Sequence, residues 1–181
     1  YKELKENIES SYVSVDRVTK GVKITLASGR LFKSMDDDVQ PLVYPLLRQI
    51  GGIVRVSKLL NVYDDDKFAN LLTAIEKRGG FLNVEIRCEG HTDDLPLPKN
   101  APFQSNWDLS TSRALNIVKL LSDFSRIPES KFSAMGYGEH RPVLPVSSIG
   151  KNSVDIRKAR AKNRRVEIYM DAFIKQNTLT N

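Results

Sequence analysis

Residues 82–93 read LNVEIRCEGHTD, and residues 105–114 read SNWDLSTSRA. From Leu82 to Cys88, apolar and polar side chains alternate, which is the period of a half-buried strand. The second stretch opens a helix that runs from about Leu109 to Phe124 with an apolar face. In an open α/β sheet, the carboxyl end of a strand and the amino end of the next helix share one crevice, where small ligands bind. The two stretches therefore indicate both a fold class and the place of a site.

Apolar periodicity predicts further elements around this pair. Three more strands are expected at 22–26, 132–137 and 166–170, and two more helices at 41–60 and 64–78. This order predicts an α/β sandwich, with a mixed four-stranded sheet and helices packed on one face. Residues 1–20 are predicted to be a linker or an N-terminal helix, residues 21–173 the domain itself, and residues 174–181 a C-terminal tail.

Length and composition fit a globular chain with one sizeable core, because 40% of the 181 residues are hydrophobic. The formal net charge of +6 arises between Lys151 and Arg165, where seven basic residues stand against Asp155 alone. Such a local patch suggests a polyanion or a carboxylate partner, although a solvated helix face is an open alternative. A sequence pI of about 9.4 also leaves a nucleic-acid-binding protein as a remote alternative.

Conventional catalytic and metal-binding motifs do not occur in the sequence. The histidines are His91 and His140, and neither H-E-x-x-H nor H-x-x-H is present. The single cysteine, Cys88, falls on the inward face of its strand and is predicted to be a core residue. No phosphate-binding loop, nucleophile elbow or dinucleotide motif is found. We therefore expect no enzyme activity, no catalytic residue, no metal and no cofactor.

The most informative pair of residues is Asp93, just after the strand, and Arg113, in the helix that follows the loop. They can face each other across the crevice, with a carboxylate on one side and a guanidinium on the other. A zwitterionic amino-acid head group fits this pair, and each charge-assisted contact would contribute roughly 1.5–3 kcal/mol. The alternative is a structural salt bridge between Asp93 and Arg113 that orders the loop.

Four blocks of residues resemble, in order, the motifs of the OmpA-like peptidoglycan-binding family. They are Gly90-His91-Thr92-Asp93, Asn106-x-x-Leu109-Ser110-x-x-Arg113-Ala114, Gly136-Tyr137-Gly138 with Arg141-Pro142, and Arg160-Ala161-x-Asn163-Arg164-Arg165-Val166-Glu167. The resemblance covers about residues 21–172. Within the family, Asp93-Asp94-x-Pro96 and the stretch 105–110 are most similar to MotB-type stator subunits of flagellar motors.

The resemblance implies a noncatalytic domain that holds the diaminopimelate of a peptidoglycan stem peptide. Asp93 and Arg113 match its main clamp. The further positions implied for peptidoglycan binding are Thr92, Asn106, Leu109 and Arg164. The chain departs from the pattern in two segments: residues 33–38 read KSMDDD where the family has a small-residue turn, and residues 61–80 resemble an inserted helical segment.

For the whole protein, the resemblance implies a periplasmic anchor that fixes a motor stator complex to the cell wall. An N-terminal segment before Tyr1 would hold it in the inner membrane beside an ion-channel partner subunit, and a homodimer is expected. An outer-membrane or lipoprotein tether, or a stator-like unit of a defence or secretion system, are the alternatives. No nucleic acid is expected as a partner.

Overall fold

The structure is a computed structural model that describes residues 1–150 and 152–177. Lys151 belongs to the predicted basic run and residues 178–181 to the predicted tail, and these positions lie outside the described residues.

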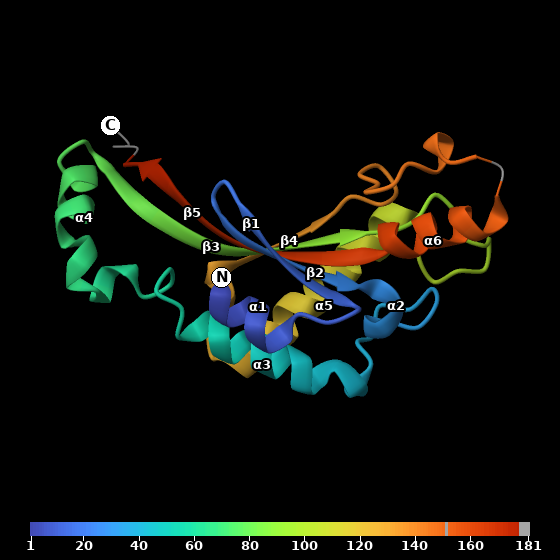
Figure 1. The fold of residues 1–181 in the computed structure, drawn as a ribbon, viewed down its shortest axis with the longest axis horizontal. Helices are drawn as coiled ribbons and strands as arrows, with labels where there is room; N and C mark the ends of the chain where they lie inside the picture. The colour runs from blue at the N-terminus through green and yellow to red at the C-terminus, as the bar shows by residue number, and fades with distance from the viewer. Residues whose placement is uncertain (151, 178–181) are drawn as a thin grey trace.

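A mixed five-stranded sheet with the order β1-β2-β5-β3-β4 forms the centre of the described chain (Figure 1). Its strands are β1 (Val13–Val18), β2 (Gly21–Ala27), β3 (Gly80–His91), β4 (Phe132–Gly136) and β5 (Arg165–Gln176). Strands β3 and β4 are parallel, and the other neighbours are antiparallel. The predicted α/β fold is confirmed, with one strand more than the predicted four.

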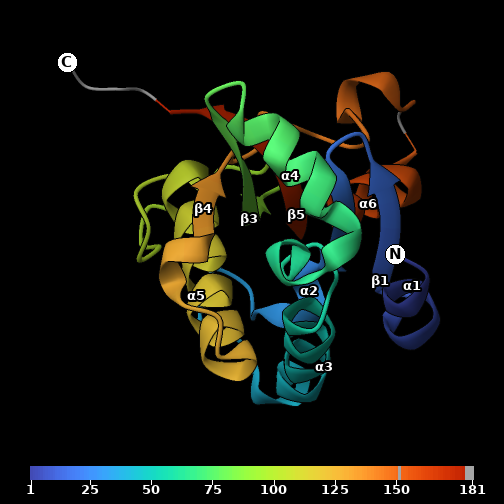
Figure 2. The same cartoon turned by 90° about the vertical axis from the view of Figure 1, so that its left-hand side faces the viewer.

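Helices α1, α3 and α5 lie on one side of this sheet, and α3 and α5 pack side by side (Figures 1 and 2). The α-helices are α1 (Lys2–Ile8), α2 (Ser28–Leu31), α3 (Tyr44–Arg55), α4 (Ala69–Glu76), α5 (Asn106–Ser125) and α6 (Ser153–Asn163). Short 3-10 turns cover Pro41–Val43, Val62–Asp64, Asp66–Phe68, Glu129–Lys131 and Val146–Ser148.

The additional strand, β1, lies at the edge of the sheet, within the residues predicted as a linker or helix. Val13 and Val15 alternate with polar residues and are buried in the core. Asp16 continues the alternation as an exposed residue, and Arg17, which follows it, is exposed too and interrupts the alternation, as is common on an edge strand that water reaches. Helix α1 precedes this strand, and its Leu4 also joins the core.

Alternate residues of β3 and β5 point to opposite faces of the sheet. The face toward α3 and α5 is apolar and carries Val84, Ile86, Cys88, Val166, Ile168 and Met170. The opposite face is polar and carries Glu85, Arg87, Glu89, His91, Arg165, Glu167 and Tyr169. Figure 1 shows the segment that follows β4, drawn in orange, running along this polar side.

Cys88 is a core residue, as predicted. Its side chain has no exposed surface, and this burial raises the pKa of the thiol to about 12. The cysteine therefore contributes packing and no nucleophile.

Two glycines let α5 approach the sheet closely. A Cβ at Gly90 would lie 2.0 Å from the carbonyl oxygen of Ser110, and a Cβ at Gly136 would lie 2.2 Å from Thr111 Oγ1. Any larger residue would push the helix away from β3 and β4. The close contact sets the amino-terminal half of α5 against the carboxyl ends of both strands, which is where ligands bind in such sheets.

Candidate functional site

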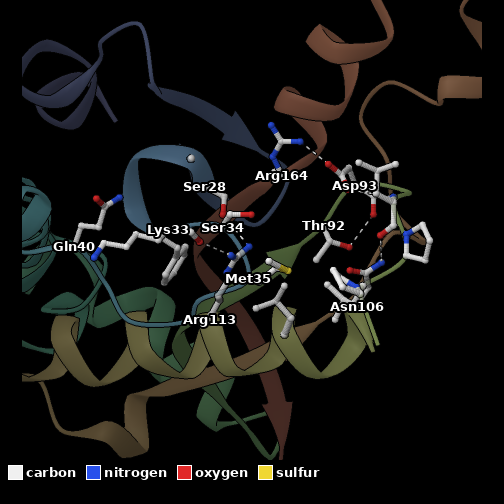
Figure 3. A pocket seen from close by; sticks show the side chains of 17 residues that line it. Ser28, Lys33, Ser34, Met35, Gln40, Thr92, Asp93, Asn106, Arg113 and Arg164 are labelled. Atoms are coloured by element: carbon white, nitrogen blue, oxygen red, sulfur yellow. Dashed lines mark hydrogen bonds and ion pairs between the residues drawn. The ribbon is translucent and has the colours of Figure 1, made fainter. Parts of the chain in front are cut away.

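A pocket of about 830 Å³ opens at the carboxyl end of β3 (Figure 3). It lies between α2 with the following loop, residues 92–98, the first half of α5, and the residue after α6. Its size is that of a small-molecule site. The residues predicted from the sequence all line it, namely Thr92, Asp93, Asn106, Leu109, Arg113 and Arg164.

Asp93 provides a buried carboxylate on one side of the pocket, since only 7% of the residue is exposed. The backbone N–H of Leu95 donates to its Oδ1 at 3.1 Å, and Arg164 Nη1 donates to its Oδ2. The amide of Asn106 donates to the carbonyl of Leu95 at 3.0 Å, which ties the loop to the start of α5. The carboxylate is thus held by its own loop and by the residue after α6, and the loop in turn is held by α5.

Arg113 lines another side of the pocket and is 5% exposed. Its Nε donates to the carbonyl of Asp36 at 2.8 Å and its Nη2 to the carbonyl of Lys33 at 3.1 Å, while Nη1 lies 3.3 Å from Ser28 Oγ. The ring of Phe32 stacks against the guanidinium at 4.8 Å. Burial lowers the pKa of Arg113 to about 10, against the opposing charges of nearby aspartates, so the side chain stays cationic at neutral pH.

Asp93 and Arg113, both in the described part of the chain, do not form the structural salt bridge that was the alternative to a ligand site. Asp93 pairs with Arg164 instead, and Arg113 is held by backbone carbonyls of the loop after α2 (Figure 3). The two charges line one pocket without neutralising each other directly.

Two arginines of the basic segment around α6 contact the loop after β3. Arg164 pairs with Asp93, and its side chain is 40% exposed. Arg160 forms a two-pronged ion pair with Asp94 at 2.7 and 3.1 Å, and this hydrogen bonding lowers the pKa of the Asp94 carboxyl. Two neighbouring aspartates therefore fasten the loop after β3 to the end of α6.

Arg165, the next residue, points away from the pocket. Its Nε donates to Glu167 Oε1 at 2.8 Å, and its remaining contacts go to the carbonyls of Asn163 and Arg141. Arg165 is buried, and its contact with the carbonyl of Arg141 connects β5 to the segment after β4.

The loop that departs from the family pattern, residues 33–38, forms a wall of the pocket. Lys33, Ser34 and Met35 line it, and Met35 has a positive φ of 55°. Asp37 fastens the loop to α5, because it accepts from Ser112 and from the Asn116 amide. Sequence reasoning did not find this wall, since its contacts to Arg113 come from backbone carbonyls, which every residue type has.

Comparison with known proteins identifies the family. Residues 60–166 match the OmpA family, and this match covers more than half of the chain. The chain belongs to the OmpA family, whose domains bind peptidoglycan without cutting it. The predicted noncatalytic class is confirmed.

Relatives and solved structures agree with this assignment. The chain is 29% identical to motility protein B of Bacillus subtilis (strain 168), over 92% of this chain and 49% of that protein. It is similar in fold to the periplasmic domain of Helicobacter pylori MotB, with a TM-score of 0.63 and 24% identity over 93% of this chain and 85% of that one. The cell wall anchor of the type VI secretion system from Pseudomonas aeruginosa gives a TM-score of 0.63 and 24% identity, over 95% and 96% of the two chains.

The chain spans about half the length of the curated relatives it matches. Among the residues that the structure describes, no helix combines the length and the apolar character needed to cross a membrane.

Proposed function

We infer that the pocket binds the diaminopimelate residue of a peptidoglycan stem peptide and that the chain anchors a larger assembly to the cell wall. The observation that carries this is the pair of opposite charges, Asp93 and Arg113, which line one pocket without pairing with each other. A zwitterionic head group would place its ammonium at Asp93 and its carboxylate at Arg113. Membership of the OmpA family supports the choice of polymer.

Arg113 has donors left for a ligand. A guanidinium carries five N–H groups, and the contacts of Arg113 to Asp36, Lys33 and Ser28 use three of them. Those contacts also fix the plane of the guanidinium before any ligand arrives, which lowers the entropy lost on binding. Arg113 would thus act as a preorganised carboxylate receptor.

Arg164 gives the pocket a third charge that can change partners. Arg164 forms an ion pair with Asp93, and its side chain is exposed enough for this ion pair to be screened by water. An arriving ammonium would take its place at Asp93, and Arg164 would then be available for a second carboxylate of the ligand. Such an exchange leaves no buried charge unpaired.

The wider role that we infer is a stator anchor. Similarity to motility protein B and to MotB periplasmic domains supports it. In this proposal the domain works in the periplasm as a homodimer, and a membrane segment elsewhere in a longer protein joins it to an ion-channel subunit. The type VI secretion anchor of similar fold keeps a non-flagellar assembly as the alternative. The sequence that precedes Tyr1 in the gene tests this point: a single membrane helix that carries an aspartate supports the stator, and a lipoprotein signal contradicts it.

Sedimentation with insoluble peptidoglycan tests the binding function. The purified chain should co-sediment with the polymer and release no soluble muropeptides over time. Asp93→Asn should co-sediment poorly, whereas the matched control Asp123→Asn, an exposed aspartate of α5 outside the pocket, should behave as wild type. Release of muropeptides, or equal sedimentation of Asp93→Asn and wild type, would overturn the proposal.

A further inference from the structure

Three side chains meet on the polar face of the sheet, outside the pocket. Glu89 and His91 are two residues apart on β3 and therefore share a face, and Glu167 of β5 is the register partner of Glu89. All three are buried, and one possible ligand atom from each lies within 4.8 Å of the others. The cluster joins two negative groups and one imidazole in a place that water scarcely reaches.

His91 has no hydrogen-bond partner in this cluster. The residue is 2% exposed, and in the described part of the chain neither Nδ1 nor Nε2 forms a hydrogen bond. The ring of Tyr137 stacks on the imidazole with a centroid distance of 5.4 Å. Because a buried polar group without a partner costs about 1–3 kcal/mol, this arrangement calls for a ligand.

His91 Nε2 points between the two glutamates. It lies 3.7 Å from Glu89 Oε2 and 3.7 Å from Glu167 Oε2. These distances are too long for hydrogen bonds. One nitrogen and two carboxylate oxygens therefore lie close together without a hydrogen bond from the imidazole to either glutamate.

The other oxygen of each glutamate is already engaged. Arg87 pairs with Glu89 Oε1, and Arg165 Nε donates to Glu167 Oε1 at 2.8 Å. Both Oε2 atoms are thereby directed toward His91. Tyr169 also donates to Glu167 Oε2 at 2.7 Å, which leaves that oxygen a second lone pair.

We propose that Glu89, His91 and Glu167 form a binding site for a divalent transition-metal cation such as Zn²⁺. Bonds of about 2.0–2.1 Å at a tetrahedral angle place ligand atoms about 3.3 Å apart, so each of the two 3.7 Å distances from His91 Nε2 would shorten by a few tenths of an ångström on binding. The cation would give His91 Nε2 its missing partner, and one water molecule that enters with the cation would complete four-coordination.

The surroundings favour a neutral imidazole. Burial and the charge of Arg165 lower the pKa of His91 to about 4, so no proton competes for Nε2 at neutral pH. The ion pair with Arg87 and the hydrogen bond from Arg165 orient the two carboxylates, as partners of metal ligands commonly do. Their positive charge opposes the cation, so we expect weaker affinity than at a structural zinc site rich in cysteine.

A cation bound at this site would stabilise the carboxyl end of β3. The chain passes from His91 through Thr92 to Asp93, which lines the pocket. A cation that bridges β3 and β5 at this point would stabilise the strand end without entering the pocket. The site stands independently of the peptidoglycan proposal, because none of its three residues lines the pocket.

Metal titration of the whole chain, stripped with a chelator and then dialysed, tests the site. Zn²⁺ at about 100 times its Kd should raise the Tm of wild type by about 5–10 °C. The rise should disappear in His91→Gln and in Glu167→Gln. It should persist in His140→Gln, which alters an exposed histidine 3.8 Å from Glu139.

Co²⁺ absorption provides a second readout should His91→Gln not fold. Wild type and His140→Gln should show the same visible bands, and Glu89→Gln should lose them. The proposal is overturned by the absence of saturable Zn²⁺ binding to wild type. It is equally overturned when Glu89→Gln and Glu167→Gln keep the wild-type shift, or when His140→Gln alone loses it.

Discussion

Asp93 pairs with Arg164 and not with Arg113, although the three side chains line the same pocket. The two arginines differ in their environment. Arg164 is partly exposed and reaches Asp93 from the end of α6, whereas Arg113 is buried and fixed by carbonyls of the loop after α2. Substitutions at the three positions should consequently differ in how they divide between stability and binding.

Asp93→Asn should weaken binding with little effect on stability. An asparagine at this position still accepts from the Leu95 N–H, and the partly exposed Arg164 can turn to water. Loss of the carboxylate should lower the affinity for a diaminopimelate stem peptide about 30-fold, or roughly 2 kcal/mol. Calorimetric titration and thermal melts measure the two effects, and a lowered Tm with unchanged affinity would count against a ligand role.

Arg113→Ala should lower both stability and affinity. The substitution removes two contacts that fasten the loop and one to Ser28 of α2, and it leaves the carbonyls of Lys33 and Asp36 without their donor. A loss of about 2–3 kcal/mol of unfolding free energy is expected. The matched variant is Asn116→Ala, which unfastens the same loop at Asp37 without removing a pocket charge. Asn116→Ala should lower the Tm and keep most of the affinity for the stem peptide. Equal losses of affinity in both variants would mean that Arg113 only holds the loop in place and does not contact the ligand.

The sequence predicted those parts whose pattern repeats locally. Strand β3 and helix α5 follow from periods of two and 3.6 over many residues, and these alone lead to Asp93 and Arg113. Strand β1 was missed because its inward-facing apolar residues end at Val15. An edge strand that is partly open to water needs few buried apolar residues, so its sequence pattern is short.

The partners of the site residues could not be predicted from spacing. Arg164 reaches Asp93 across 71 positions, and Glu167 reaches His91 through the register of β5 on β3. Such contacts depend on how whole strands pair, which local periodicity does not specify. The backbone carbonyls that hold Arg113 could not be predicted either, because every residue type has one.

Cys88 should resist alkylation in the folded protein. Burial holds its pKa at about 12, so at about pH 8 the side chain remains a protonated, inaccessible thiol, whereas an unfolded chain has the ordinary thiol pKa of about 8.5. Mass spectrometry after iodoacetamide treatment should show no label under native conditions and complete labelling in denaturant. Fast labelling of natively folded protein would show that the strand opens more readily than its burial indicates.

Residues 61–80 should support stability and leave binding unchanged. Leu72 and Ile75 of α4 are buried, and the Tyr63 hydroxyl donates to the carbonyl of Leu82 at 2.8 Å. The segment thus covers the start of β3, and Figure 1 places α4 at the other end of that strand from α2 and α6. The family match begins at residue 60 and runs through the segment, while its interpretation as an insertion stays a prediction.

Leu72→Ala tests this division of roles directly. Removing a buried leucine side chain at the edge of the core should cost about 2 kcal/mol of unfolding free energy, and hence several degrees in Tm, because the small cavity can partly collapse. Since no residue of α4 lines the pocket, the affinity of the folded variant for a stem peptide should stay within about twofold of wild type. The control is Leu71→Ala on the same helix, where the side chain is exposed and neither quantity should change. A marked loss of affinity in Leu72→Ala at a temperature where it is fully folded would mean that α4 communicates with the pocket along β3.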